Sequence, residues 1–195
     1  MRRFVVVVDA QRDFMCADGK LPVGGADRLI VPLQAWLSGL QPADTAGVLF
    51  TFDTHDVRTY PESAEATQFP IHCVHGTPGW QLVVDPGALH PGIPAYRMEK
   101  PEFDMWAASS GPIEALGDVG RTMARDSFFA ELQDAGIRDV TVVGVAADFC
   151  VRWAVEGLIA RGFRVTVPAD LTRGIAREID AVRRDEWKEA EVVLA

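Results

Sequence analysis

Short runs of largely apolar residues dominate the hydrophobic pattern of the chain, and each run is followed by a polar or glycine-rich segment. The three longest runs span residues 4–8, 47–52 and 140–145. An unbroken apolar run of this length is typical of a strand buried on both faces, as in a parallel sheet. Shorter apolar segments predict further strands at residues 96–98, 163–167 and 192–194.

Segments with apolar residues at helical spacing alternate with these strands. They span residues 26–40, 127–134, 148–161 and 180–188. Each has one apolar face and predicts a helix. Strands that alternate with helices imply a mostly parallel sheet with helices on both faces. We therefore predict an α/β fold, a Rossmann-like three-layer arrangement, in one domain that spans residues 1–195.

Two stretches lack periodic apolar positions. Residues 11–25 are rich in Asp and Gly and predict a loop, and residues 54–82 include prolines at 61, 70 and 78. A segment as long as the second one, without regular structure in a compact domain, usually serves function. We expect residues 54–82 to contribute to the functional site.

Four polar residues of different chemistry follow the ends of predicted strands. They are Asp9, Asp53, Lys100 and Cys150. Ligands of open α/β sheets bind beyond the carboxyl ends of the strands. We therefore expect these four side chains to meet at one edge of the sheet.

Cys150 falls in the first turn of the helix predicted after residues 140–145. The unpaired N–H groups and partial positive charge of a helix N-terminus favour the thiolate, the reactive form of cysteine. In that interpretation Asp9 is the base and Lys100 stabilises the negative charge. The alternatives are a small buried Cys150, a loop-capping Asp9 and a solvated Lys100.

A group of acidic and imidazole side chains lies in or next to the 54–82 segment. Its members are Asp53, His55, Glu65 and His72, with Glu62 as an alternative to Glu65. Two imidazoles and two carboxylates suit a borderline divalent cation, so we expect one such ion, with Zn²⁺ first and Fe²⁺ or Mn²⁺ as alternatives. The competing interpretation is a polar loop with scattered histidines, because the spacing matches no stereotyped zinc pattern.

Composition narrows the class of protein. The 195 residues carry a formal net charge of −9 and no long basic cluster, which argues against nucleic-acid and anionic-membrane partners. The three cysteines are far apart, and no apolar stretch is long enough for a signal peptide or a membrane span. We expect a cytoplasmic protein without disulfides.

Other residues carry less specific signals. Cys16 and Cys73 are expected to be packing residues or loop thiols. Phe14, Phe69 and Trp106 are candidates for the wall of an apolar pocket that holds a flat ring, with core packing as the equal alternative.

Five segments of the chain resemble the motifs of a known family. They read VVVVDAQRDF, TFDTH, FPIHCVHGTPGW, EKPEFDMW and VVGVAADFCVRWAVEGLIARGF. Nearly the whole chain is similar to the nicotinamidase-type members of the isochorismatase-like cysteine hydrolases. The last segment, a strand followed by a cysteine and a helix, is the most specific of the five.

The resemblance implies a catalytic triad of Asp9, Lys100 and Cys150. It implies metal ligation by Asp53, His55 and His72, with Glu65 at a position where members carry His or Glu. It also implies a cis peptide between Val145 and Ala146, which turns the Ala146 N–H toward the same point as the Cys150 N–H and forms an oxyanion hole.

The function implied is hydrolysis of a small carboxamide through a thioester, with nicotinamide as the first choice of substrate. One alternative is a related amidase that acts on a carbamoyl or ureido compound. Another is an inactive relative that binds a metal or ligand. We further expect a homo-oligomer of unspecified subunit number.

Overall fold

The computed structural model describes residues 2–118, 120–187 and 192–195 of the chain. In this part of the chain nine strands form one sheet, in the order β5-β4-β3-β2-β1-β6-β7-β9, with β8 paired to β6 beside β7. Their bounds are Arg3–Val8 (β1), Thr45–Asp53 (β2), Ala95–Lys100 (β3), Ile113–Ala115 (β4), Thr122–Met123 (β5), Asp139–Val145 (β6), Arg164–Val167 (β7), Thr172–Arg173 (β8) and Val192–Leu194 (β9).

The sheet is mostly parallel, as predicted. β1 lies between β2 and β6 and pairs in parallel with both, and β3, β7, β8 and β9 extend the parallel part. Only two pairings of the sheet are antiparallel, those of β3 with β4 and of β4 with β5, at the edge beyond β3. These two short strands, and β8, were not predicted, because none of them lies in a long apolar run.

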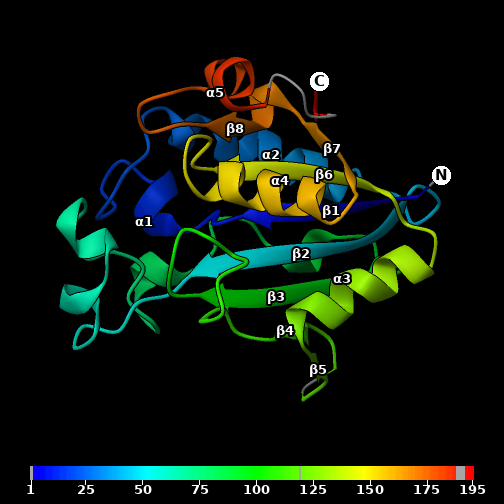
Figure 1. Cartoon of the computed structure of the whole chain (residues 1–195), viewed down its shortest axis with the longest axis horizontal. Coiled ribbons are helices and arrows are strands. Elements are labelled where there is room, and N and C mark those ends of the chain that lie inside the picture. The colour runs from blue at the N-terminus through cyan, green and yellow to red at the C-terminus, as the bar shows by residue number, and fades with distance from the viewer. Residues whose placement is uncertain (1, 119, 188–191) are drawn as a thin grey trace.

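Helices cover both faces of the sheet (Figure 1). Their bounds are Arg12–Met15 (α1), Ile30–Ser38 (α2), Arg125–Asp134 (α3), Cys150–Ala160 (α4) and Ile179–Glu186 (α5). Side chains of β1 alternate between two cores: Phe4, Val6 and Val8 pack with α3, α4 and α5, whereas Val5 and Val7 pack with α2. Burial on both faces explains the unbroken apolar run of this strand.

The helix boundaries differ from the prediction in detail. The segment 26–40 begins with a 3₁₀ turn at Ala26–Leu29, and only Ile30–Ser38 is α-helical. The helix predicted from residue 148 begins at Cys150, and the one predicted for 180–188 spans Ile179–Glu186. Residue 188 lies outside the described residues.

The carboxyl ends of β1, β2, β3 and β6 form one edge, and the 54–82 segment, cyan to green in Figure 1, extends beyond it. This segment contains three single turns of 3₁₀ helix, Tyr60–Glu62, Glu65–Thr67 and Pro78–Trp80. At the same edge Gly144 has φ +109°, and a Cβ there would stand 2.1 Å from the Val8 carbonyl oxygen. Only glycine lets β1 and β6 approach so closely where their functional residues follow.

No helix in the described ranges is both long and apolar enough to cross a membrane.

Candidate active site and metal centre

Lys100 joins the polar side chains at the carboxyl edge of the sheet. It is the last residue of β3 and only 1% exposed, and its Nζ lies 2.8 Å from Asp9 Oδ2 and 3.3 Å from Asp53 Oδ1. The same Nζ donates to Cys150 Sγ at 3.4 Å. The structure therefore brings together all four residues that the sequence places after strand ends.

Cys150 is the first residue of α4, at the helix N-terminus that the sequence predicts. Burial raises the pKa of its thiol well above the usual value, Lys100 opposes this, and Asp9 and Asp53 add to the increase. Burial disfavours the charged form of Lys100 as well, but Asp53, Asp9 and Cys150 raise its pKa well above the usual value. The resting site thus combines a lysine cation with a neutral thiol, and the thiol needs a base to react.

Thr51 holds Asp9 in place, a role that the sequence interpretation missed. Its hydroxyl donates to Asp9 Oδ1 at 2.6 Å and accepts from the Asp9 N–H at 3.2 Å, and neither side chain is exposed. Asp9 has φ +46°, which is uncommon for a residue other than glycine. The available signal was a threonine inside the apolar run of β2, on the strand face shared with Asp53.

Gln11 is a second residue that the interpretation missed. Its amide nitrogen donates at 2.8 Å to the carbonyl oxygens of both Asp53 and Trp80, and its side-chain oxygen accepts from the Asp53 N–H at 2.8 Å. Gln11 thereby fixes the end of β2 next to the 54–82 segment. The sequence signal was its place in the VVVVDAQRDF segment, two residues after Asp9.

The turn between β6 and α4 contains a cis peptide bond between Val145 and Ala146. Among the described residues, no backbone or side-chain oxygen accepts from the N–H groups of Ala146 or Cys150. The neighbouring Asp148 carboxylate accepts from three consecutive N–H groups, those of residues 175–177, at 2.8–2.9 Å. Asp148 thus ties the turn before α4 to residues 175–177.

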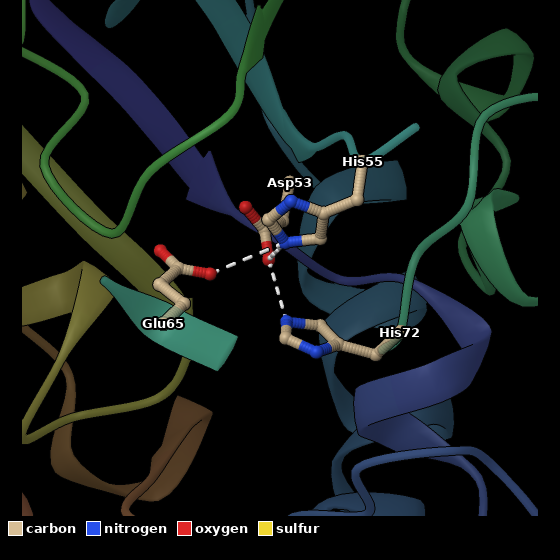
Figure 2. A group of neighbouring side chains, drawn as sticks. All are labelled: Asp53, His55, Glu65 and His72. Carbon is tan, nitrogen blue, oxygen red and sulfur yellow. Dashed lines mark hydrogen bonds and ion pairs between the residues drawn. The ribbon is translucent and has the colours of Figure 1, made fainter. Parts of the chain in front are cut away.

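The four expected metal ligands form one buried cluster, in which their side chains point toward a common centre (Figure 2). One potential ligand atom from each of Asp53, His55, Glu65 and His72 lies within 4.8 Å of the others. All four residues are at most 4% exposed. Glu62, the alternative to Glu65, is exposed and outside the cluster.

The donor chemistry of this cluster fits a divalent cation. His72 Nδ1 lies 2.8 Å from the Pro70 carbonyl oxygen, which only a protonated nitrogen can satisfy, so in a neutral imidazole Nε2 carries a lone pair. That Nε2 faces Asp53 Oδ2 at 2.9 Å, and His55 Nε2 lies 3.1 Å from the same Asp53 oxygen and 3.2 Å from Glu65 Oε2. The lone pair of His72 Nε2 thus faces the lone pairs of the Asp53 carboxylate, and such an arrangement requires a proton or a cation between the two atoms.

Protons fill that role when no cation is bound. Burial opposes the charge of His55, but hydrogen bonds and charges from Asp53 and Glu65 raise its pKa to about 9. Burial alone would raise the pKa of Asp53, but Lys100, His55 and His72 hold it well below its usual range. The cluster therefore binds positive charge strongly.

A cavity of about 920 Å³ gives access to this cluster. Its lining includes the cluster residues His55 and Glu65 and the aromatic residues Tyr60, Phe103 and Trp153. The three aromatic residues expected in the pocket are not in its lining. Phe14 packs against the His72 ring, and Trp106 packs over Gly157 with Arg161 above it; Phe69 lies behind the lining residue Phe103, with ring centroids 5.7 Å apart.

Comparison with known proteins agrees with this fold. A sequence model of the isochorismatase domain matches residues 3–188. The chain is 28% identical to the nicotinamidase/pyrazinamidase of Mycobacterium tuberculosis (strain ATCC 25618 / H37Rv), over 98% of this chain and 97% of the relative. It is also 28% identical to the nicotinamidase of Escherichia coli (strain K12), over 89% of this chain and 84% of the relative.

Two solved structures share the fold along nearly their whole length. The pyrazinamidase of Pyrococcus horikoshii in complex with zinc has a TM-score of 0.74 at 24% identity, with 100% of this chain and 99% of that chain covered. PnC1 from L. infantum in complex with nicotinate has a TM-score of 0.74 at 27% identity, with 100% and 92% covered.

The fold, and the polar side chains gathered at the carboxyl ends of its strands, define a class of protein. It is an α/β enzyme whose site lies beyond the carboxyl ends of a parallel sheet. Because the family match covers most of the chain, the chain belongs to the isochorismatase family. Within it the chain is of the nicotinamidase type, whose members are hydrolases of carbon–nitrogen bonds in amides. The expected family is therefore confirmed.

Proposed function

We propose that the protein is a metal-dependent cysteine amidohydrolase that converts nicotinamide and water to nicotinate and ammonia. The observation that carries the proposal is the position of Lys100 Nζ, 2.8 Å from Asp9 and 3.4 Å from Cys150 Sγ in a buried site. The relatives named nicotinamidase support this choice of substrate.

In the proposed first half-reaction Asp9 takes the proton of the Cys150 thiol, and the sulfur attacks the amide carbonyl carbon. The free N–H groups of Ala146 and Cys150 donate to the oxyanion, a contribution of about 3–4 kcal/mol for one such donor in other enzymes. Asp9 then returns the proton to the departing nitrogen, so that ammonia leaves and a thioester remains on Cys150.

In the second half-reaction Asp9 takes a proton from water, whose oxygen attacks the thioester. The carbon–sulfur bond breaks, nicotinate leaves and Cys150 regains its proton. Lys100 stays positively charged in both halves, so it stabilises each negative charge that develops on Asp9 or on sulfur.

Asp53, His55, Glu65 and His72 are the proposed ligands of one divalent ion. Zinc is the first choice, with iron or manganese as alternatives, because mixed imidazole and carboxylate ligands suit such ions. When bound, the ion supplies a Lewis acid at the base of the cavity that can hold the ring nitrogen of the amide. The Pyrococcus relative, solved with zinc, supports this choice.

Two further parts of the proposal concern the setting of the protein. Its three cysteines are free, which fits a reducing compartment such as the cytoplasm. The expected homo-oligomer remains a prediction, and light scattering of the purified protein tests it.

The test is ammonia release from a panel of nicotinamide, pyrazinamide and a ureido compound, each with and without chelator. The proposal expects turnover of nicotinamide that the chelator abolishes and added zinc restores. Preference for the ureido compound would favour the related amidase, and metal binding without any turnover would favour the inactive relative.

A further inference from the structure

The wall of the access cavity is strongly acidic. Six carboxylate residues line it, and they are Asp56, Glu62, Glu65, Glu99, Glu102 and Asp104. No lysine or arginine is among the described residues of the lining. The lining also includes His55 of the metal cluster, so a substrate that enters through this cavity meets these carboxylates.

Charges deeper in the site compensate one another. Lys100 lies between Asp9 and Asp53. A divalent ion adds two positive charges to the carboxylates of Asp53 and Glu65. The buried part of the loaded site is therefore close to neutral, and the field that a substrate meets comes mainly from the outer wall.

The outer carboxylates are only partly compensated. Asp56 pairs with Arg58 at 3.1 Å, and Glu99 lies 4.0 Å from Arg97, which bonds more closely to Glu114 at 2.7 Å. Glu62, Glu102 and Asp104 form no ion pair with any described residue. The Glu102 carboxylate accepts from the Ser109 hydroxyl, and the Asp104 carboxylate accepts from the Trp106 N–H. Three carboxylates of the lining thus have no cationic partner among the described residues.

We infer that this acidic wall selects the charge of the substrate: the site accepts uncharged amides, rejects amides that carry a carboxylate and expels its own carboxylate product. The inference rests on the proposed function and narrows its substrate class. Glu62 and Glu102 are the specificity-determining residues, because both are exposed and lack a cationic partner. One such charge about 10 Å away in water changes anion binding by about twofold.

Pyridine-3,5-dicarboxamide is a probe that contains its own control. Hydrolysis of one amide gives 5-carbamoylpyridine-3-carboxylate, which has nearly the same shape but a negative charge. We expect the mono-acid to accumulate. At low salt its kcat/KM as a substrate should be about two- to tenfold lower than that of the diamide, counted per amide group. High salt should reduce this difference, because about 1 M salt shortens the Debye length to about 3 Å.

Single variants Glu62→Gln and Glu102→Gln should each raise kcat/KM for the mono-acid about twofold and leave that for the diamide unchanged. Glu131→Gln is the matched control. It removes the same charge from an exposed residue of α3 that lines a separate cavity with Ala95 and Tyr96. This control should change neither rate.

A second measurement uses nicotinamide itself and remains valid if the diamide is too large to enter. Inhibition of nicotinamide hydrolysis by added nicotinate should be weak at low salt and strengthen as salt is raised. Equal rates for diamide and mono-acid, or nicotinate inhibition that does not change with salt, would overturn the inference while the amidase function stands. If no amide releases ammonia, the proposed function fails and this inference fails with it.

Discussion

At the scale of single residues, the chemistry depends on how Lys100 divides its charge between neighbours. It lies between two buried carboxylates and a buried thiol, and it alone opposes the rise in the pKa of Cys150 among the principal influences on that thiol. The lysine therefore serves the reaction and also compensates charges that would otherwise be costly to bury.

Replacement Lys100→Met keeps the length of the side chain and removes its charge. We predict a fall in the maximal rate of about a hundredfold or more. Alkylation of Cys150 by iodoacetamide should slow at neutral pH, because the pKa of the thiol rises further and less thiolate is present. The measurement is alkylation rate against pH for both proteins.

The control for this variant is its fold, since an uncompensated buried charge costs about 3–5 kcal/mol. Circular dichroism should show a folded protein at the assay temperature. Lys100→Arg should restore little activity, because a planar guanidinium group does not fit a site that holds a compact ammonium group. Superimposed alkylation curves for wild type and Lys100→Met would remove Lys100 from the mechanism.

Thr51→Val tests whether the orientation of Asp9 matters. Valine has nearly the same shape but leaves the Asp9 N–H and one carboxylate oxygen without their partner, at a cost of about 1–3 kcal/mol. We predict a tenfold or larger fall in kcat, because Asp9 loses the contact that orients it as the base; a tenfold fall corresponds to about 1.4 kcal/mol in the activation barrier. Thr51→Ser keeps the hydroxyl and should keep most activity; equal losses in both variants would argue against this role.

At the scale of elements, the segment from β2 to β3 supplies three of the four cluster residues, and its carboxylates can be distinguished by substitution. Glu65→Gln should reduce the metal content of the purified protein, because Glu65 is buried within the cluster. Glu62→Gln is the matched control and should retain the metal, since Glu62 is exposed. Elemental analysis measures the metal content of both variants. A lower metal content in Glu62→Gln than in Glu65→Gln would show that the wrong glutamate of this loop is assigned as a ligand.

The same cluster should link metal binding to pH. The pKa of His55 rises from 6.5 to about 9 in the metal-free protein, so the ring is protonated at pH 7 and a metal must displace that proton. Because the pKa of His55 is higher in the folded than in the unfolded protein, protonated His55 stabilises the metal-free fold. This stabilisation is fully present below about pH 6.5 and is lost as pH rises through about 9.

Apparent zinc affinity should therefore increase from pH 6 to pH 9, and zinc binding at pH 7 should release protons. Titration calorimetry in buffers of different ionisation enthalpy measures the number released. Zinc binding without proton release at pH 7 would contradict the protonation state assigned to His55.

The parts of the fold that could be predicted are those with a strong burial pattern. Strands β1, β2 and β6 are buried on both faces and leave long, largely apolar runs, whereas β4, with three residues, and β5, with two, leave none. The short helix α1 was likewise hidden in the expected loop at residues 11–25.

The candidate site likewise contains residues that could be predicted from the sequence and residues that could not. Polar residues that follow buried strands are visible in the sequence, and the structure gathers Asp9, Asp53, Lys100 and Cys150 as expected; their catalytic roles stay predictions. Thr51 was missed because its importance comes from a hydrogen bond between strands. Phe14, Phe69 and Trp106 show that an aromatic residue type does not distinguish the wall of a cavity from packing behind it.

At the scale of the whole molecule, one sheet edge gathers residues that are far apart in the sequence, from Asp9 to Cys150. Asp9, Asp53, Lys100 and Cys150 come from four strand ends that the parallel pairing of β1 with β2 and β6, and of β2 with β3, aligns. The fold thus provides the alignment, and the segments beyond it provide the metal ligands and the acidic entrance.

The central claim is a thioester on Cys150, and the most direct measurement is mass spectrometry of peptides from protein quenched with acid during turnover of nicotinamide. The account predicts a nicotinoyl group on the peptide that contains Cys150 and none on those with Cys16 or Cys73. It also predicts no ammonia release by Cys150→Ala. Full turnover by Cys150→Ala, or an acyl group on another cysteine, would contradict it.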